Sequence, residues 1–308
     1  MAKLIPPRPE YRKERLLAGF LALTAFVLLF AYRFLHAKGF LGTGALPVVL
    51  LMEAVVFLLP AVIYCAYRGR GFVKSLRLRP VHAVQLPLLI SGFFALLFGC
   101  LLLSILCRGT GSLGNVATSF ESPAPEGFLM GAARFFVLAL FPALFEEFFF
   151  RGVLTAEYER RGFFRAILLP TILFAMIHLD LKNLPVYLFS GFLFSLVLFA
   201  TDSLIATMIL HTLYNTVSLF GQRYLNALYD FTGSVELFLF FLILFFLIAL
   251  LVFCRQAMRL YRIYERAGTP NPRRNIPYAV QFYTTLDALR DPAFLLCIAL
   301  FVAGVILA

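Results

Sequence analysis

The sequence predicts an all-α protein, a polytopic bundle of about eight to nine transmembrane helices with a cytoplasmic N-terminus. Hydrophobic residues make up 62% of the 308 positions and charged residues only 14%, whereas average globular chains carry roughly 25% charged residues. The apolar residues form long runs, and Lys and Arg gather between alternate runs. This composition excludes a soluble enzyme, a disordered chain and a disulfide-stapled secreted module, because none of these could hold so much apolar surface.

Nine apolar segments are long enough, or nearly so, to cross about 30 Å of hydrocarbon at about 1.5 Å per residue. We expect helices, because a span of this length must satisfy its backbone hydrogen bonds internally. The first segment follows a basic tail, but its apolar run is too long for a signal peptide, so we expect an uncleaved span. The nine segments lie near residues 16–32, 45–67, 83–107, 130–158, 163–179, 184–201, 203–220, 235–254 and 293–308.

Basic residues between the segments predict the orientation. The N-terminal tail and the 68–82 loop hold five Lys and Arg each, the 159–165 turn holds three and the 255–292 loop seven. The loops on the opposite side hold two, one, one and one. This bias places the basic loops in the cytoplasm and accounts for the net charge of +11 without a nucleic-acid partner. We expect a multi-pass protein of the cell membrane, with the lipid bilayer as a partner.

Ionisable residues inside the segments are the candidates for function, because a charge at the centre of a span costs about 2.5–3.5 kcal/mol. The fourth segment reads LFPALFEEFFFRGVL and contains Glu146, Glu147 and Arg151. A helix places Glu147 and Arg151 on one face, four residues apart, where they can form an ion pair. An ion pair that only locks helices together does not explain Glu146, which points about 100° away. We therefore expect Glu146 to face a cavity.

The fifth and seventh segments add imidazole and amide groups. His178 follows Phe174 by one turn, and His211 precedes Asn215 by one turn. A lone histidine in a span is more often a packing residue, but two of the four histidines lie deep inside these segments. Glu146 and His178 lie about 21–22 Å from the inner boundary and His211 about 14 Å from it, a difference that helix tilt can absorb. We expect the three side chains to meet in one chamber.

Such a set suits the hydrolysis of an amide. A carboxylate beside a histidine can polarise a water molecule and accept its proton, and a second histidine with an asparagine can donate to a developing oxyanion. The sequence has neither an HExxH motif nor a serine nucleophile elbow. A zinc site is an alternative, because Glu146, His178 and His211 could supply three ligands and leave a fourth position open. These residue types do not by themselves choose between the two versions.

The three motifs resemble those of the CPBP family of intramembrane proteases, which includes CAAX prenyl endopeptidases and bacteriocin-processing, Abi-like self-immunity proteins. The family pattern is EExxxR, then FxxxH, then HxxxN, on successive helices. This chain has EEFFFR at 146–151, FAMIH at 174–178 and HTLYN at 211–215. The resemblance covers roughly residues 125–220 and implies that Arg151 holds Glu147 and so shapes the site.

The same resemblance implies roles for the remaining motif residues. Glu146 would be the general base on water, and His178 would help to hold that water. His211 and Asn215 would bind the oxyanion. Of the metal-dependent and glutamate-dependent mechanisms argued for the family, we favour the metal-free one, with no cofactor. The expected activity is that of an intramembrane endopeptidase acting on a membrane-associated or lipidated peptide or protein.

Two further residues are expected to line the site. Phe174 belongs to the second motif, and Glu53 lies in the second segment at a depth similar to that of Glu146. Glu53 either lines the chamber or pairs with Arg134, which we place near the outer interface.

We divide the chain into three regions. Residues 1–125 form an N-terminal three-span region, residues 126–220 the catalytic four-helix core, and residues 221–308 the C-terminal spans. The last region includes a basic cytoplasmic loop, 255–292, which we expect to lie along the anionic inner leaflet.

Two other functions stay open. A proton-coupled transporter also needs buried Glu and His residues, although no paired halves are evident in the sequence. A non-catalytic scaffold or immunity protein could use the same fold to bind a peptide. The sequence indicates neither the substrate nor the oligomeric state.

Overall fold

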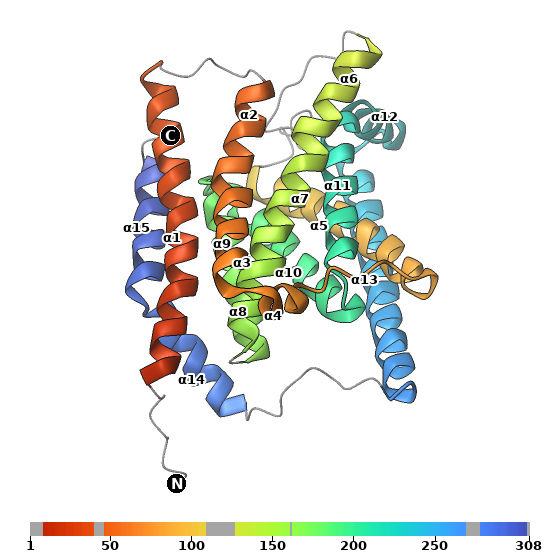
Figure 1. Ribbon diagram of the computed structural model, residues 1–308. Helices are drawn as coiled ribbons and strands as arrows, with labels where there is room; N and C mark the ends of the chain where they lie inside the picture. The colour runs from red at the N-terminus through yellow and green to blue at the C-terminus, as the bar shows by residue number, and fades with distance from the viewer. Residues whose placement is uncertain (1–8, 40–45, 109–126, 161, 269–277, 307–308) are drawn as a thin grey trace.

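A computed structural model describes residues 9–39, 46–108, 127–160, 162–268 and 278–306 (Figure 1). Nearly all of these residues are helical, and no strand occurs among them. The predicted all-α class is therefore confirmed. One sequence-based expectation, the region boundary at 125/126, lies outside the described residues.

Six stretches are long and apolar enough to cross a membrane, and two bent helix pairs raise the number to eight. The chain is therefore a multi-pass membrane protein. The predicted segment 163–179 is the exception, because it forms a helix of only 15 residues, Phe163–Ile177, about 22 Å long. The six stretches are Leu17–His36, Leu46–Arg68, Ala83–Cys107, Phe128–Glu159, Leu184–Thr201 and Val235–Arg266; the bent pairs are Leu204–Phe220 with Gln222–Thr232, at 68°, and Gln281–Leu289 with Pro292–Ile306, at 54°.

The N-terminal half of the chain holds three spans and the first part of the fourth. Its elements are α1 (Pro9–Ala37), α2 (Leu46–Glu53), η1 (Ala54–Leu58), α3 (Leu59–Arg68), α4 (Arg70–Val73), η2 (Lys74–Leu76), η3 (Ala83–Gln85), α5 (Leu86–Arg108), α6 (Phe128–Arg134), η5 (Phe135–Leu140) and α7 (Phe141–Glu147).

The remaining elements complete the fourth span and form the C-terminal half of the chain. They are η6 (Phe148–Leu154), α8 (Thr155–Glu159), α9 (Phe163–Ile177), α10 (Leu184–Thr201), α11 (Leu204–Phe220), α12 (Gln222–Thr232), α13 (Val235–Arg266), α14 (Tyr278–Leu289) and α15 (Pro292–Ile306).

The second and fourth spans are interrupted by π-helical turns, η1 in the second and η5 and η6 in the fourth. Pro60 and Pro142 each follow such a turn by two residues. A proline has no N–H to donate to the carbonyl four residues back, and the wider hydrogen bonding of a π turn accommodates that loss. Leu59 N–H, for example, donates to Ala54 O, five residues back. Turns of this kind occur frequently at functional sites.

The helices that carry the three motifs are neighbours in the bundle. α11 packs on η5 and α7 of the fourth span, α9 packs along α10, and α10 also contacts α11. The start of α1, the α8 end of the fourth span and the C-terminal end of α13 lie at one end of the bundle (Figure 1). These are the segments that the basic residues assign to the cytoplasmic side, so the fold and the predicted orientation agree.

An ionic cluster closes the bundle at this end. Arg77 has the left-handed backbone angle φ 55°, and its side chain contacts Asp202 Oδ1 at 2.6 Å and Glu159 Oε1 at 2.7 Å. Arg79 also pairs with Asp202, and Leu204 N–H donates to the Arg77 carbonyl at 2.8 Å. The cluster therefore joins the segment after the second span to the ends of the fourth span and of α10.

The predicted loop 255–292 is largely helical, which corrects the expectation drawn from its polarity. α13 continues to Arg266, and α14 occupies Tyr278–Leu289. Arginine, leucine and glutamine are good helix formers, and Leu260 is buried against the bundle. The helix therefore extends well beyond the apolar run that predicted its end near residue 254.

Candidate active site

An ion pair buried within the fourth span lies at the centre of the site. Arg151 Nη1 donates to Glu147 Oε1 at 2.9 Å, and both side chains are fully buried. The four-residue spacing of the motif places the two groups on one helix face, as expected from the sequence. A buried ion of either sign is costly without a partner, so each of these residues depends on the other.

Helix α10 contributes further contacts to Arg151. Arg151 Nη2 donates to the carbonyl of Gly191 at 3.1 Å, and the guanidinium lies 4.2 Å from the ring centre of Phe174 and 5.2 Å from that of Phe194. A Cβ atom on Gly191 would lie 3.1 Å from Arg151 Nη2. The close approach of α10 to the ion pair therefore requires a residue without a side chain.

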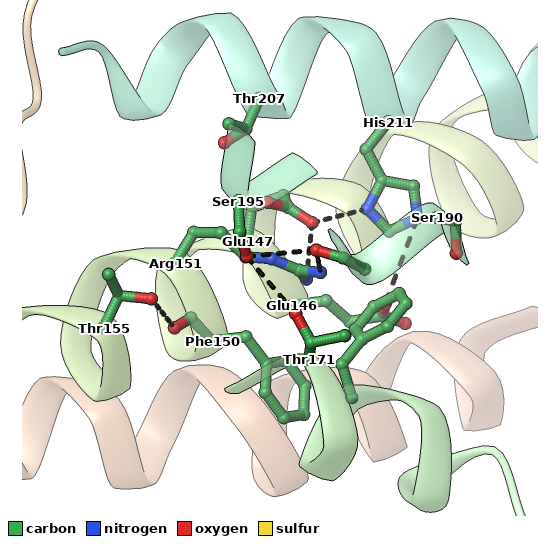
Figure 2. A network of polar contacts seen from close by, with 12 residues as sticks. Glu146, Glu147, Phe150, Arg151, Thr155, Thr171, Ser190, Ser195, Thr207 and His211 are labelled. Atoms are coloured by element: carbon green, nitrogen blue, oxygen red, sulfur yellow. Dashed lines mark hydrogen bonds and ion pairs between the residues drawn. The ribbon is translucent and has the colours of Figure 1, made fainter. Parts of the chain in front are cut away.

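His211 connects this ion pair to the other glutamate of the motif. Its Nδ1 lies 3.0 Å from Glu147 Oε1, and its Nε2 lies 4.0 Å from Glu146 Oε2. A carboxylate can only accept a hydrogen bond, so Nδ1 carries the hydrogen and Nε2 is the nitrogen on the Glu146 side. The Phe194 ring stacks on the imidazole at 4.6 Å and limits its rotation. Figure 2 shows these side chains from the fourth span and α11 pointing toward one another.

Glu146 is the least satisfied member of the group. It is 8% exposed, and its Oε2 is buried without a hydrogen-bond partner among the described residues. An unpaired buried acceptor costs about 1–3 kcal/mol, and more when it is charged. This oxygen is therefore available to a donor such as water or a peptide N–H.

His178 lies at the end of α9 rather than inside a span, which corrects the sequence-based expectation. The helix ends at Ile177, and the next residue, Leu179, has the left-handed φ of 52°. His178 Nδ1 is 2.7 Å from the Phe174 carbonyl, and its ring stacks on Tyr187 at 3.8 Å. Among the described side chains, no hydrogen bond or ion pair joins His178 to Glu146.

The Phe174 ring contacts both histidines. Its ring centre is 4.9 Å from that of His178 and 5.9 Å from that of His211. His178 therefore belongs to the same aromatic cluster as His211. Its Nδ1 donates to a carbonyl, which leaves Nε2 as an acceptor.

Asn215 and Glu53 lie on two different helices, α11 and α2, that both pack on the fourth span. Asn215 Nδ2 donates to the Ala139 carbonyl at 3.4 Å, so the Asn215 amide contacts the backbone of η5 rather than the imidazole one turn before it. Glu53 ends α2, which packs on α7, and is 8% exposed. No ion pair between Glu53 and Arg134 occurs in the described part of the chain, so the alternative of a Glu53–Arg134 pair is not supported.

The side chains as arranged do not fit a metal ion. Across the described ranges, no group of three or more His, Cys, Asp or Glu residues has the geometry to hold one. The set Glu146, His178 and His211 is therefore not gathered into such a group. We therefore derive no chemical step through a metal.

The comparison with protein families bears directly on this cluster. Residues 128–217 match the family described as type II CAAX prenyl endopeptidase Rce1-like. This segment is Rce1-like. The match begins at the first residue of α6 and ends two residues after Asn215, so it includes all three motifs and confirms the family resemblance. No curated protein and no solved structure matches the chain.

The match makes residues 128–217 similar to type II CAAX prenyl endopeptidases. It also divides the residues around the site into two groups. The motif residues and the glycine at 191 lie inside the segment, whereas Glu53 lies outside it.

Three contacts of the Rce1-like segment were not predicted from the sequence. Gly191 accepts from Arg151, Phe194 stacks on His211, and Tyr187 stacks on His178. All three come from α10, which carries none of the motifs. The one available signal is a glycine in the middle of an apolar span, since small residues there permit close helix approach.

Proposed function

We propose that the protein is an intramembrane endopeptidase that hydrolyses a peptide bond of a membrane-associated or lipidated peptide or protein. The observation that carries the proposal is the placement of His211 between two glutamates, with Nδ1 on Glu147 and Nε2 4.0 Å from Glu146. Glu146 can serve as a base and His211 as a hydrogen-bond donor, and the reacting atoms would lie beside both side chains.

Glu146 is the proposed general base. It takes a proton from a water molecule, and the resulting hydroxide attacks the carbonyl carbon of the scissile bond. The same proton then passes from Glu146 to the leaving amine, so the carboxylate is regenerated at the end of each cycle. Glu146 is buried, so few water molecules screen the electrostatic interaction between its carboxylate and the reacting groups.

His211 is the proposed oxyanion donor. Glu147 lies 3.0 Å from Nδ1 and orients the imidazole, so that Nε2 faces the position from which it would donate to the oxyanion. Arg151 fixes Glu147 in place for this role. Arg151, Glu147 and His211 thus form one hydrogen-bonded chain from the guanidinium to the imidazole that faces Glu146.

His178 and Asn215 have supporting roles in the proposal. His178 Nε2 is the acceptor that would hold the attacking water. Asn215 has two amide hydrogens and uses one on Ala139 O, so the other is available as a second donor to the oxyanion. Glu53 and Phe174 line the site. We propose that the reaction needs no metal, since these residues already supply both a base and donors.

The test compares membrane peptides from cells that express the wild type, Glu146→Gln or Glu236→Gln. Glu236 is an exposed carboxylate at the start of α13 and serves as the matched control. The proposal predicts a peptide that is trimmed in the wild type and in Glu236→Gln but intact in Glu146→Gln. Identical peptides in all three would contradict it.

The same variant distinguishes the two other functions. Biological function that survives in Glu146→Gln would favour a non-catalytic scaffold or immunity protein. Substrate flux through vesicles that contain the purified protein, with no cleavage product, would favour a proton-coupled transporter.

A further inference from the structure

A third carboxylate lies beside the proposed catalytic group, on a helix that the family motifs do not include. Glu53 is the last residue of α2 and the residue before the π turn η1. α2 and η1 both pack on α7, which carries Glu146. One turn after Glu53, the ring of Phe57 contacts Phe149 and Phe150, each at 5.7 Å. This packing fixes the second span against the fourth at the level of the glutamates.

The Glu53 carboxylate is buried without compensation. Its residue is 8% exposed, and its Oε2 has no hydrogen-bond partner among the described residues. Glu146 Oε2 is in the same condition. Glu53 precedes Phe57 by four residues and Glu146 precedes Phe150 by four, so the Phe57–Phe150 contact places the two glutamates at one level of packed spans. Two unsatisfied acceptor oxygens therefore lie at the same depth on neighbouring helices, in a region that water screens poorly.

The nearby charged groups do not neutralise Glu53. The charged groups on the elements packed around Glu146 are Glu53 from the second span, Glu147 and Arg151 from the fourth and His211 from α11. Arg151 and His211 are both hydrogen-bonded to Glu147. Two neighbouring buried carboxylates cannot both be ionised without a large repulsion, so such pairs hold one proton between them.

We propose that Glu53 is a positioning residue that holds this proton and donates it as a hydrogen bond to the Glu146 carboxylate. The inference rests on the proposed function, because it assigns Glu146 as the base. The proton stays on the Glu53–Glu146 pair throughout the cycle, while the proton taken from water passes through Glu146 to the leaving amine. Glu53 therefore fixes the direction of the Glu146 carboxylate and lets it remain the only ionised member of the pair.

Two properties of the fold support this role. Glu53 directly precedes η1 and Glu147 directly precedes η6, so the acidic residues of both spans lie at π turns, where functional residues are frequent. Glu53 also lies outside the Rce1-like segment, so the second span supplies a polar group that the matched segment lacks. A residue with only a packing role would be apolar at this depth.

The first test measures infrared absorption of the purified protein in lipid vesicles at neutral pH, which needs no substrate. The wild type and the Glu236→Gln control should show the carbonyl band of a protonated carboxylic acid, and Glu53→Gln should lack it. An unchanged band in Glu53→Gln would overturn the inference. This result is independent of whether the protein is a protease.

The second test measures kcat/KM against pH for the peptide that the wild type cleaves. Wild-type activity should fall at alkaline pH as the pair loses its shared proton, whereas Glu53→Gln should keep its activity there, because an amide N–H still donates to Glu146. Glu53→Gln should stay within about tenfold of the wild type at the optimum, and Glu53→Ala should lose about 100-fold or more. A Glu53→Gln profile with the wild-type alkaline fall would overturn the inference, while a wild type without any cleavage would count against the proposed function alone.

Discussion

His211 Nδ1 and Glu147 Oε1 lie 3.0 Å apart, in a contact that joins α11 to the fourth span inside the bundle. Glu147 also accepts from Arg151 at 2.9 Å, so one carboxylate oxygen orients both a guanidinium and an imidazole. The contact turns His211 Nε2 toward Glu146. The second glutamate of the motif thus determines how the histidine faces the first.

Glu147→Gln should lower kcat by about 10²–10³-fold and change KM little. The amide keeps the shape of the side chain but weakens the contact that orients His211, whose donation is needed only when the oxyanion forms. Steady-state kinetics on the cleaved peptide checks this prediction, with Glu236→Gln as the control. A variant with wild-type kcat would show that Glu147 has a structural role alone.

Arg151→Ala should destabilise the protein by about 3–5 kcal/mol, because it leaves the Glu147 carboxylate buried and unpaired. The double variant Glu147→Ala with Arg151→Ala should lose less than the sum of the two single variants, because neither charge is then left alone. Denaturant unfolding in detergent measures the three free energies. Additive losses would contradict the coupling between the two side chains.

Gly191→Ala should reduce activity by misplacing Arg151. The new methyl group would lie 3.1 Å from Arg151 Nη2 and 3.1 Å from the Phe174 ring, so the guanidinium must move from the Gly191 carbonyl. We expect a loss of about tenfold, below the roughly 100-fold cost of a displacement of about 1 Å at a catalytic group, because the neighbours need to move by only a few tenths of an ångström. Gly71→Ala is the matched control, since a Cβ there meets nothing within 4 Å, and equal activity in both variants would refute the prediction.

Arg77→Ala should destabilise the protein by about 2–3 kcal/mol, the scale of lost hydrogen bonds to charged groups. The Arg77 side chain is 9% exposed and contacts both Glu159 and Asp202. Arg79 also pairs with Asp202 but is 62% exposed, so Arg79→Ala should cost about 0–1 kcal/mol. Thermal unfolding of the two variants gives the comparison, and a reversed order would contradict the role of Arg77 in closing this end of the bundle.

Contacts within one helix could be predicted from the sequence. Residues 147 and 151 share a face because the helical period fixes their angle, whatever surrounds them. The long apolar runs predicted most of the spans for a similar reason, since only a helix satisfies the backbone in lipid. Both inferences depend on local geometry alone.

Contacts between helices could not be predicted in the same way. Gly191 faces Arg151 because α10 packs close to the fourth span, and no motif marks it. The end of α9 before His178 and the π turns beside Glu53 and Glu147 depend on backbone hydrogen bonds that residue periodicity does not encode. The predicted depth of His178 counted residues along an assumed helix and did not reveal that α9 ends at Ile177.

The most direct test of the account measures peptide cleavage by purified Glu146→Gln in lipid vesicles, with its unfolding temperature measured beside the wild type. The account predicts that the variant folds with a similar unfolding temperature and loses cleavage by about 10³-fold or more, because it has no base to activate water. A folded Glu146→Gln variant that cleaves the peptide at the wild-type rate would contradict the account.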